Sequence, residues 1–201
     1  MNMNNNTLND KIMKKIVLTI IAALALGFAV SAQEVSNEEW RNMSRKERKE
    51  YKLQEAIKKQ EATMALLNSK QWVLEAIQLQ LKSGETFMLE PNLNFVGVQN
   101  EVSTVQLGSS GDIGLNGVGG ITIDGNVRKY DLKENKKPGT GAYLRIEVMG
   151  ASAGHVTISI RISPDGTADA TLTNNFGDRL TYRGRIMSIA ESSAYKGTVT
   201  Y

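Results

Sequence analysis

The stretch Val156-Thr157-Ile158-Ser159-Ile160-Arg161-Ile162-Ser163 alternates strictly between apolar and polar side chains. Successive side chains of a β-strand point to opposite faces, so the stretch predicts a strand with one face in the core and the other in water. The next three residues, Pro164-Asp165-Gly166, are types that favour a tight turn. An alternating strand that ends in such a turn is typical of an antiparallel sheet with one solvated face.

The same pattern continues on both sides of this strand, from about Lys70 to the C-terminus. Short segments of alternating or β-branched residues are separated by clusters of Gly, Asn and Ser. Because no helical pattern interrupts them, sequential hairpins are the expected connections. The predicted strands are 72–81, 86–89, 93–98, 102–107, 120–131, 142–149, 155–163, 167–173, 179–189 and 195–201.

About ten consecutive strands predict a mainly β domain over residues 70–201, with two possible architectures. One is a closed antiparallel barrel, lipocalin-like in its succession of hairpins, and the other is a two-layer sandwich. Closure would remove exposed strand edges, but both architectures bury one face of each strand, so alternation does not distinguish them. Four aromatic side chains are expected to fill the core in either case. They are Trp72, Phe87, Phe95 and Tyr182.

Residues 33–69 are predicted to form one long charged helix before the β domain. The segment 36–69 contains neither Gly nor Pro and is rich in strong helix formers. Ser36 and Ser44 each precede a glutamate by three residues, which is the pattern of a capping box, so a break near Met43 or Ser44 is expected. One apolar face should pack on the β domain. Its members are Leu53, Ala56, Ile57, Met64 and Leu67.

The first 32 residues resemble a secretory signal peptide. Lys14 and Lys15 precede a mostly apolar run over residues 16–30, and Val30-Ser31-Ala32 supplies small residues for a cut after Ala32. The run is short for a membrane helix, which needs about 20 apolar residues, although an uncleaved anchor is the alternative. Either Met1 or Met13 could be the start. We therefore expect a periplasmic or secreted protein with no membrane span after cleavage.

The charge and cysteine content exclude several classes of function. Removal of residues 1–32 takes away three lysines and one aspartate, which lowers the formal net charge from +3 to about +1. This nearly neutral product gives no support for binding nucleic acid through bulk charge. The chain has no cysteine and a single histidine, so disulfides, lipid-modified cysteine and a zinc site are not expected. No cofactor is predicted.

A glycine-rich segment at 108–120 is the most unusual part of the chain. It does not match a phosphate-binding loop, because a strand follows where a helix is needed. It also lacks the acidic residue that closes a calcium loop, since Ile123 occupies that position. The segment is interpreted as a hairpin loop, or alternatively as a loop that contacts a ligand or partner. The candidate contact residues there and just upstream are Asn92, Asn94, Asp112, Asn116, Gly117, Gly119 and Gly120.

Catalysis has little support in the sequence. His155 is the only histidine, it begins a predicted strand, and no Gly-x-Ser-x-Gly elbow marks a nucleophile. An exposed structural histidine is the simpler interpretation. A hydrolase based on carboxylates is the alternative, and it would need two acidic groups in one cleft with separated pKa values. Asp112, Asp124 and Glu147 are the candidates for it.

Several short motifs carry a family resemblance. They are Pro91-Asn92-Leu93-Asn94-Phe95-Val96, Val105-Gln106-Leu107-Gly108-Ser109, Asn116-Gly117-Val118-Gly119-Gly120-Ile121-Thr122, Tyr182-Arg183-Gly184-Arg185 and Tyr195-Lys196-Gly197. From about Ser44 to its end the chain resembles the family of domain of unknown function 4251. The resemblance implies a small exported protein of the Bacteroidetes type and supplies no activity, substrate or site residue.

These observations favour an exported, non-catalytic β domain that binds a small apolar or amphipathic ligand, or an envelope protein as partner. A closed barrel of about eight strands can hold one small ligand. The alternatives are the carboxylate-based hydrolase and a structural envelope protein that assembles through its N-terminal helix.

Overall fold

The computed structural model describes residues 37–109, 117–150 and 154–197. The chain forms two compact units, a first unit that ends at Ser44 and a second unit from Arg45 onward. The helix α2 (Asn37–Asn42) belongs to the first unit, and the helix α3 (Arg45–Ser69) begins the second. The predicted break at Met43 and Ser44 is confirmed, so the single long helix expected over 33–69 is interrupted within the described residues.

Nine of the ten predicted strands are present, all in the second unit. They are β1 (Gln71–Leu81), β2 (Thr86–Met88), β3 (Phe95–Gln99), β4 (Val102–Leu107), β5 (Ile121–Glu134), β6 (Ala142–Gly150), β7 (Gly154–Ile162), β8 (Thr167–Asn174) and β9 (Arg179–Ser188). The strand predicted at 195–201 is not formed over residues 195–197, and the rest of it lies outside the described residues.

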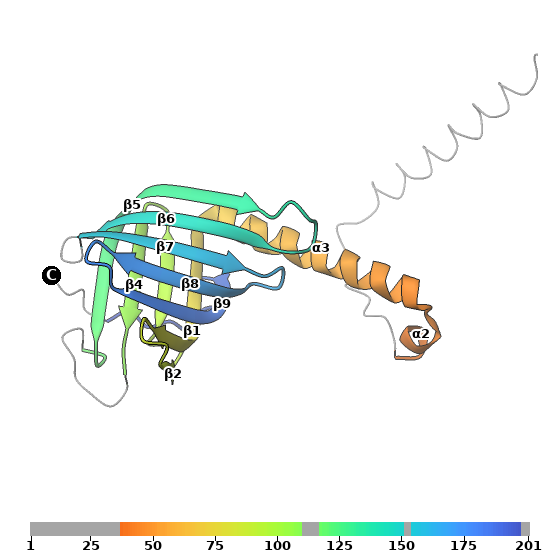
Figure 1. The fold of residues 1–201 in the computed structure, drawn as a ribbon, viewed down its shortest axis with the longest axis horizontal. Helices are drawn as coiled ribbons and strands as arrows, with labels where there is room; N and C mark the ends of the chain where they lie inside the picture. Colours follow the sequence, from red (N-terminus) through yellow and green to blue (C-terminus); the bar gives the residue numbers. More distant parts are fainter. Residues whose placement is uncertain (1–36, 110–116, 151–153, 198–201) are drawn as a thin grey trace, which may run out of the picture. The chain divides into compact units, whose positions relative to one another are not determined.

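The sheet closes on itself as an antiparallel barrel (Figure 1). Each strand from β3 to β9 pairs with the next, and β1 pairs with both β3 and β9, which makes eight strands in the closed ring. The short β2 is an additional strand that pairs with the second half of β1. Of the two predicted architectures the barrel is therefore correct.

The seam between β1 and β9 depends on a glycine. Ala76 lies opposite Gly184, and the register shifts between Ala76 and Gln78 at a bulge. A Cβ atom on residue 184 would lie 1.9 Å from the carbonyl oxygen of Glu75. Only glycine allows the two backbones to approach this closely.

The barrel interior holds the core. Ile158 and Ile160 of β7 have no exposed surface, while Arg161 between Ile160 and Ile162 is exposed, which confirms the predicted alternation. Three of the four predicted core aromatics are buried, namely Trp72, Phe95 and Tyr182. Phe87 is 47% exposed, so that prediction is wrong. It lies on β2, which is outside the closed ring and has no second neighbouring strand.

The C-terminal half of α3 closes one end of the barrel (Figure 1). The Leu67 side chain is fully buried in the core, and its carbonyl oxygen accepts a hydrogen bond of 2.7 Å from the Tyr130 hydroxyl. The Trp72 indole nitrogen donates to the same hydroxyl at 3.0 Å. About two helical turns before Leu67, the Gln60 side-chain oxygen accepts a hydrogen bond of 2.7 Å from the backbone nitrogen of Gly141. The predicted apolar face thus packs on the β domain at its C-terminal end, while Leu53 is 43% exposed.

Residues 189–197, here called the C-terminal segment, cross the outer face of β1 and β4. The buried Glu75 carboxylate accepts hydrogen bonds from the Ser192 hydroxyl at 2.8 Å and the Ser193 backbone nitrogen at 2.6 Å. The fully buried amide of Gln106 donates to the Tyr195 carbonyl at 2.8 Å and accepts from the backbone nitrogen of Gly197 at 2.8 Å. These side chains satisfy the backbone of the segment in place of a strand partner.

Candidate functional site

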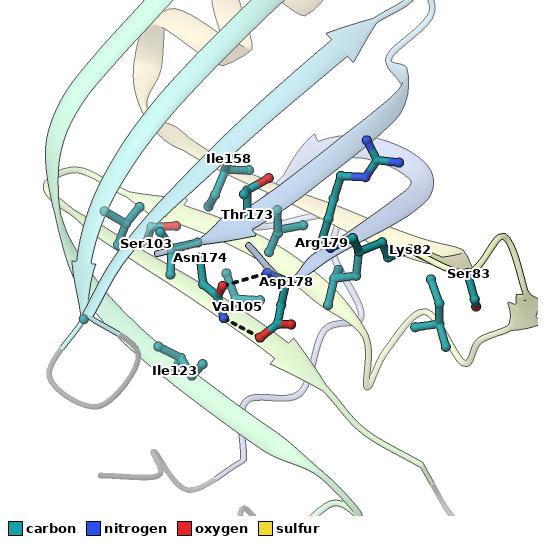
Figure 2. A pocket seen from close by; sticks show the side chains of 16 residues that line it. Lys82, Ser83, Ser103, Val105, Ile123, Ile158, Thr173, Asn174, Asp178 and Arg179 are labelled. Carbon is teal, nitrogen blue, oxygen red and sulfur yellow. Dashed lines mark hydrogen bonds between the residues drawn. The ribbon is translucent and has the colours of Figure 1, made fainter. Parts of the chain in front are cut away.

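A cavity of about 520 Å³ lies in the barrel, at the end opposite to α3. Its walls are the inward side chains of β4 to β9 and the end of β1 (Figure 2). Gln60 of α3 contacts Gly141, just before the start of β6, whereas the cavity is lined by Val148 and Gly150 at the other end of that strand. The apolar lining residues are Leu81, Val105, Ile123, Val148, Gly150, Val156, Ile158, Leu172 and Leu180.

The cavity exists because the inward positions at this end carry aliphatic side chains of modest size. The two largest core side chains lie elsewhere, since neither Trp72 nor Tyr182 lines the cavity. Trp72 contacts Tyr130 beneath α3. Tyr182 reaches from β9 to the backbone of β4, where its hydroxyl donates to the Gln106 carbonyl at 3.0 Å. Burial raises the pKa of Tyr182, so this hydroxyl stays protonated at neutral pH.

Away from the rim, the described lining residues offer a ligand no free hydrogen-bond donor. Ser103 is buried there, and its hydroxyl donates to the Gly97 carbonyl at 3.1 Å. The charged lining residues, Lys82, Asp178 and Arg179, all lie beyond or at the ends of strands, at the rim. A ligand that enters must therefore place hydrocarbon inside, because an unpaired polar group there would lose its hydration without compensation.

The β8–β9 hairpin forms one side of the rim. The Asn174 amide donates to the Asp178 carboxylate at 3.0 Å, and the Asp178 backbone nitrogen donates back to the Asn174 side-chain oxygen at 3.0 Å (Figure 2). Lys82 donates to the Gly177 carbonyl at 3.3 Å and so joins the β1 end to this hairpin. Phe176, which lies between Asn174 and Asp178 in this hairpin, exposes 87% of its surface. The rim thus combines polar groups with one exposed aromatic side chain.

Those candidate contact residues that the structure describes do not line this cavity. Asn94 is fully buried and acts as a clamp, since its amide donates to the Gly108 carbonyl and its side-chain oxygen accepts from the Gly108 nitrogen, both at 3.0 Å. The Asn92 carbonyl accepts from the Tyr195 nitrogen at 2.8 Å. Gly117 and Gly119 have φ values of 74° and 73°, in the left-handed region that glycine adopts without strain.

Two positions of that set, Asp112 and Asn116, lie outside the described residues. The remaining one, Gly120, lies against β4, because a Cβ on it would fall 2.0 Å from the Leu107 carbonyl oxygen. A role of this loop in contacts with a ligand or partner remains a prediction.

The candidate catalytic groups that the structure describes, Asp124, Glu147 and His155, lie on the outer face of the barrel, whereas Asp112 lies outside the described residues. Asp124 forms an ion pair of 2.6 Å with Lys196, and Glu147 lies 3.3 Å from Arg145. The His155 imidazole is 4.0 Å from the Glu147 carboxylate, at the start of β7 as predicted, and it is half-buried rather than exposed. Each carboxylate is thus satisfied by a cation, and neither lines the cavity.

The described residues contain neither a metal-binding cluster nor a helix able to span a membrane. Within residues 37–109, 117–150 and 154–197, no group of three or more His, Cys, Asp or Glu side chains is placed to hold a metal ion. No helix in the same part of the chain has both the length and the apolar character needed to cross a membrane.

Sequence reasoning did not identify the cavity-lining residues. Alternation places Val148, Ile158 and Leu172 on inward faces, but it does not show which inward positions stay unfilled. One signal was available: the largest side chains, Trp72 and Tyr182, are absent from the strand ends near Gly150 and Asn174. That pattern locates the cavity only when the register of seven strands is known, and the closed barrel supplies that register.

Comparisons with known proteins concern the same part of the chain. A family model for a domain of unknown function (DUF4251) matches residues 54–186, which include every residue that lines the cavity. No curated protein matches the chain. A crystal structure of a DUF4251 family protein from Bacteroides eggerthii DSM 20697 is similar, with 28% identity and a TM-score of 0.51. The match covers 67% of this chain and 90% of that one. Since the family model spans well over half of the residues, from the docked part of α3 to β9, the chain belongs to the DUF4251 family.

Proposed function

We propose that this protein is a non-catalytic binding module that takes up a small amphipathic ligand, with the hydrocarbon part inside the barrel. The observation that carries the proposal is the apolar cavity of about 520 Å³ at the open end. Pockets for small ligands are commonly about 300–1,000 Å³, mostly apolar, with a few polar groups that fix orientation. An eight-stranded barrel is just wide enough to hold one such molecule.

The arrangement of polar groups supports an orientation for the ligand. Ser103 already donates to a backbone carbonyl, so the interior favours an alkyl or ring hydrocarbon. Lys82 and Asp178 at the rim supply charges of both signs, which suits a polar head that stays in water. The leader-like residues 1–32 support the further proposal that binding takes place in the periplasm or outside the cell. A protein partner is the second candidate occupant of the exposed rim, where Phe176 is the most accessible apolar side chain.

A neutral fluorescent probe tests the proposal directly. N-phenyl-1-naphthylamine should show enhanced emission with the wild-type protein, and decanoate should displace it. Val156→Phe places a larger side chain at a half-buried lining position, and we expect it to weaken probe binding about tenfold or more. Met149→Phe is the matched control, because Met149 is 43% exposed, does not line the cavity and lies opposite His155, one residue before Val156, in the β6–β7 register.

Thermal unfolding checks that both variants remain folded. The proposal fails if the wild-type protein does not bind the probe, or if folded Val156→Phe binds it as the wild type does. It also fails if Met149→Phe removes binding to the same extent, since the probe would then lie on the outer surface.

A further inference from the structure

A second hollow, of about 340 Å³, lies on the outer face of the barrel across β1, β7, β8 and β9, beside β2. We call it the polar groove. At its centre the hydroxyls of Thr171 and Thr181 are 3.2 Å apart on neighbouring strands. Gln80 lies opposite Thr181 on the next strand, so hydroxyl and amide groups form a row across three strands. Such groups both donate and accept hydrogen bonds.

Three arginines and one aspartate line the polar groove. Asp169 lies between Arg161 on β7 and Arg183 on β9, and it pairs with Arg183 at 2.7 Å. No hydrogen bond or ion pair joins the guanidinium of Arg161 or Arg179 to another of the described residues. The groove therefore carries two positive charges without a counterion among its described lining, on a protein whose net charge is nearly neutral after removal of the leader.

The spacing of these two charges argues for an extended ligand. Arg161 lies opposite Asp169 and Arg179 lies opposite Thr173, four residues further along β8. At about 3.3 Å per residue, their backbone positions are roughly 13 Å apart along the strand. The row of Thr171 and Thr181 lies between them. Two acidic groups on one molecule, separated by a part that carries hydroxyls, would use the whole groove.

We propose that the polar groove binds an acidic oligosaccharide. The planar guanidinium groups of Arg161 and Arg179 match carboxylate or sulfate oxygens, which they can bind through two parallel hydrogen bonds. The hydroxyl and amide row between them matches sugar hydroxyls. A single-stranded nucleic acid is less well suited, because no aromatic residue is among those that line the groove and could stack on a base.

Isothermal titration with two acidic probes and their neutral counterpart tests this site. The probes are tri-galacturonate and a sulfated heparin-derived tetrasaccharide, and the neutral counterpart is the methyl ester of tri-galacturonate. We expect at least one acidic probe to bind the full chain and the methyl ester to bind at least tenfold more weakly. Arg161→Gln should weaken binding of the acidic probe about tenfold. Asp169→Asn should strengthen binding of that probe several-fold, because the substitution removes a negative charge from the groove and releases Arg183 from its ion pair.

The matched control is the double variant Lys49→Gln and Lys58→Gln. It removes two exposed positive charges from α3, away from the groove, and should leave affinity unchanged. The proposal is overturned if neither acidic probe binds, if the methyl ester binds equally, or if inorganic sulfate binds as tightly as the oligosaccharides. It is also overturned if Arg161→Gln has no effect, or if the α3 control weakens binding to the same degree.

This site and the barrel cavity can fail independently. Arg161 does not line the cavity, so Arg161→Gln should leave binding of N-phenyl-1-naphthylamine unchanged. Val156→Phe in turn should leave binding of the acidic probe unchanged, since Val156 does not line the groove.

Discussion

Tyr130 joins α3 to the barrel through a single hydroxyl that donates to Leu67 and accepts from Trp72. Burial raises the pKa of Tyr130 to about 12, and the hydrogen bond from Trp72 opposes part of that rise. An unfolded tyrosine loses its proton near pH 10. The stabilising contribution of Tyr130 is therefore complete below about pH 10 and is lost as the pH rises towards 12.

Tyr130→Phe should lower the free energy of unfolding by about 1–3 kcal/mol at pH 8, because the Leu67 carbonyl and the Trp72 indole each lose a buried partner. The difference in the free energy of unfolding between Tyr130→Phe and the wild type should shrink between pH 10 and 12, because the wild type loses the contribution of Tyr130. Urea unfolding at several pH values measures this. Tyr195→Phe, at a side chain that is 64% exposed, should follow the wild-type profile. A constant difference up to pH 12 would contradict the assignment.

At the residue scale, burial could be predicted where it follows from alternation and could not where it depends on tertiary contacts. Ile158 and Ile160 are buried as their positions in an alternating strand require. Gln106 has an ordinary polar side chain on an outward face, yet it is fully buried, because the C-terminal segment covers it. Phe87 has a core-type side chain but lies on the extra strand. Neither outcome is encoded in the local sequence.

At the scale of elements, α3 has two halves with different environments. Leu67 is fully buried beneath the barrel, whereas Leu53 in the same helix is 43% exposed. Leu67→Ala should lower the free energy of unfolding by about 2–5 kcal/mol, since it leaves a cavity in the core. Leu53→Ala should change it by less than about 0.5 kcal/mol.

The substitution and the secondary structure are the same at both positions of α3, so helix propensity cancels in this comparison. Urea unfolding measures the two values. Equal losses at Leu53 and Leu67 would show that α3 contributes only as a helix and does not seal the barrel.

Elements were predicted well where their signals are local. The break between α2 and α3 follows from the serines that precede glutamates, and the strands follow from alternation and turn residues. The strand predicted at 195–201 is not formed over its described residues, 195–197, although Tyr195 lies in a sequence with β-type composition. The backbone of residues 195–197 instead bonds to the side chain of Gln106, a distant partner that the local sequence does not indicate.

At the scale of the whole molecule, the second unit should be stable without the first. A chain that starts at Arg45 should melt within about 2 °C of one that starts at Gln33, because a loss of 1 kcal/mol would shift Tm by roughly 2–4 °C in a protein of this size. A chain that starts at Lys70 loses Leu67 and the Leu67 carbonyl that Tyr130 binds, and it should melt much lower.

Circular dichroism melting curves separate these cases, and mass in solution adds a test of assembly. If the chains that start at Gln33 and Arg45 have the same number of subunits in solution, assembly through α2 is excluded. A large fall in Tm on removal of residues 33–44 would contradict the independence of the two units.

The closed barrel, the cavity and the polar groove all depend on strand order and register, which the sequence left open. Val105 and Leu172 reach one cavity from strands that are far apart in the chain, and Arg161 and Arg179 reach one groove. Alternation assigns each of them to a face. Only the pairing of β1 with β9 brings those faces together in a ring.

That pairing also sets the order in which the molecule can be built. Trp72 pairs with Ser188, 116 residues later, whereas the hairpins from β3 to β8 join neighbours in the chain. During synthesis these hairpins can form as they emerge, but the free edge of β1 has to wait for β9, and contacts so distant in sequence form slowly. A chain that stops short of β9 keeps two open edges, which are templates for pairing with other chains. Completion of β9 is therefore the step that separates a closed barrel from a sheet with edges open to other chains.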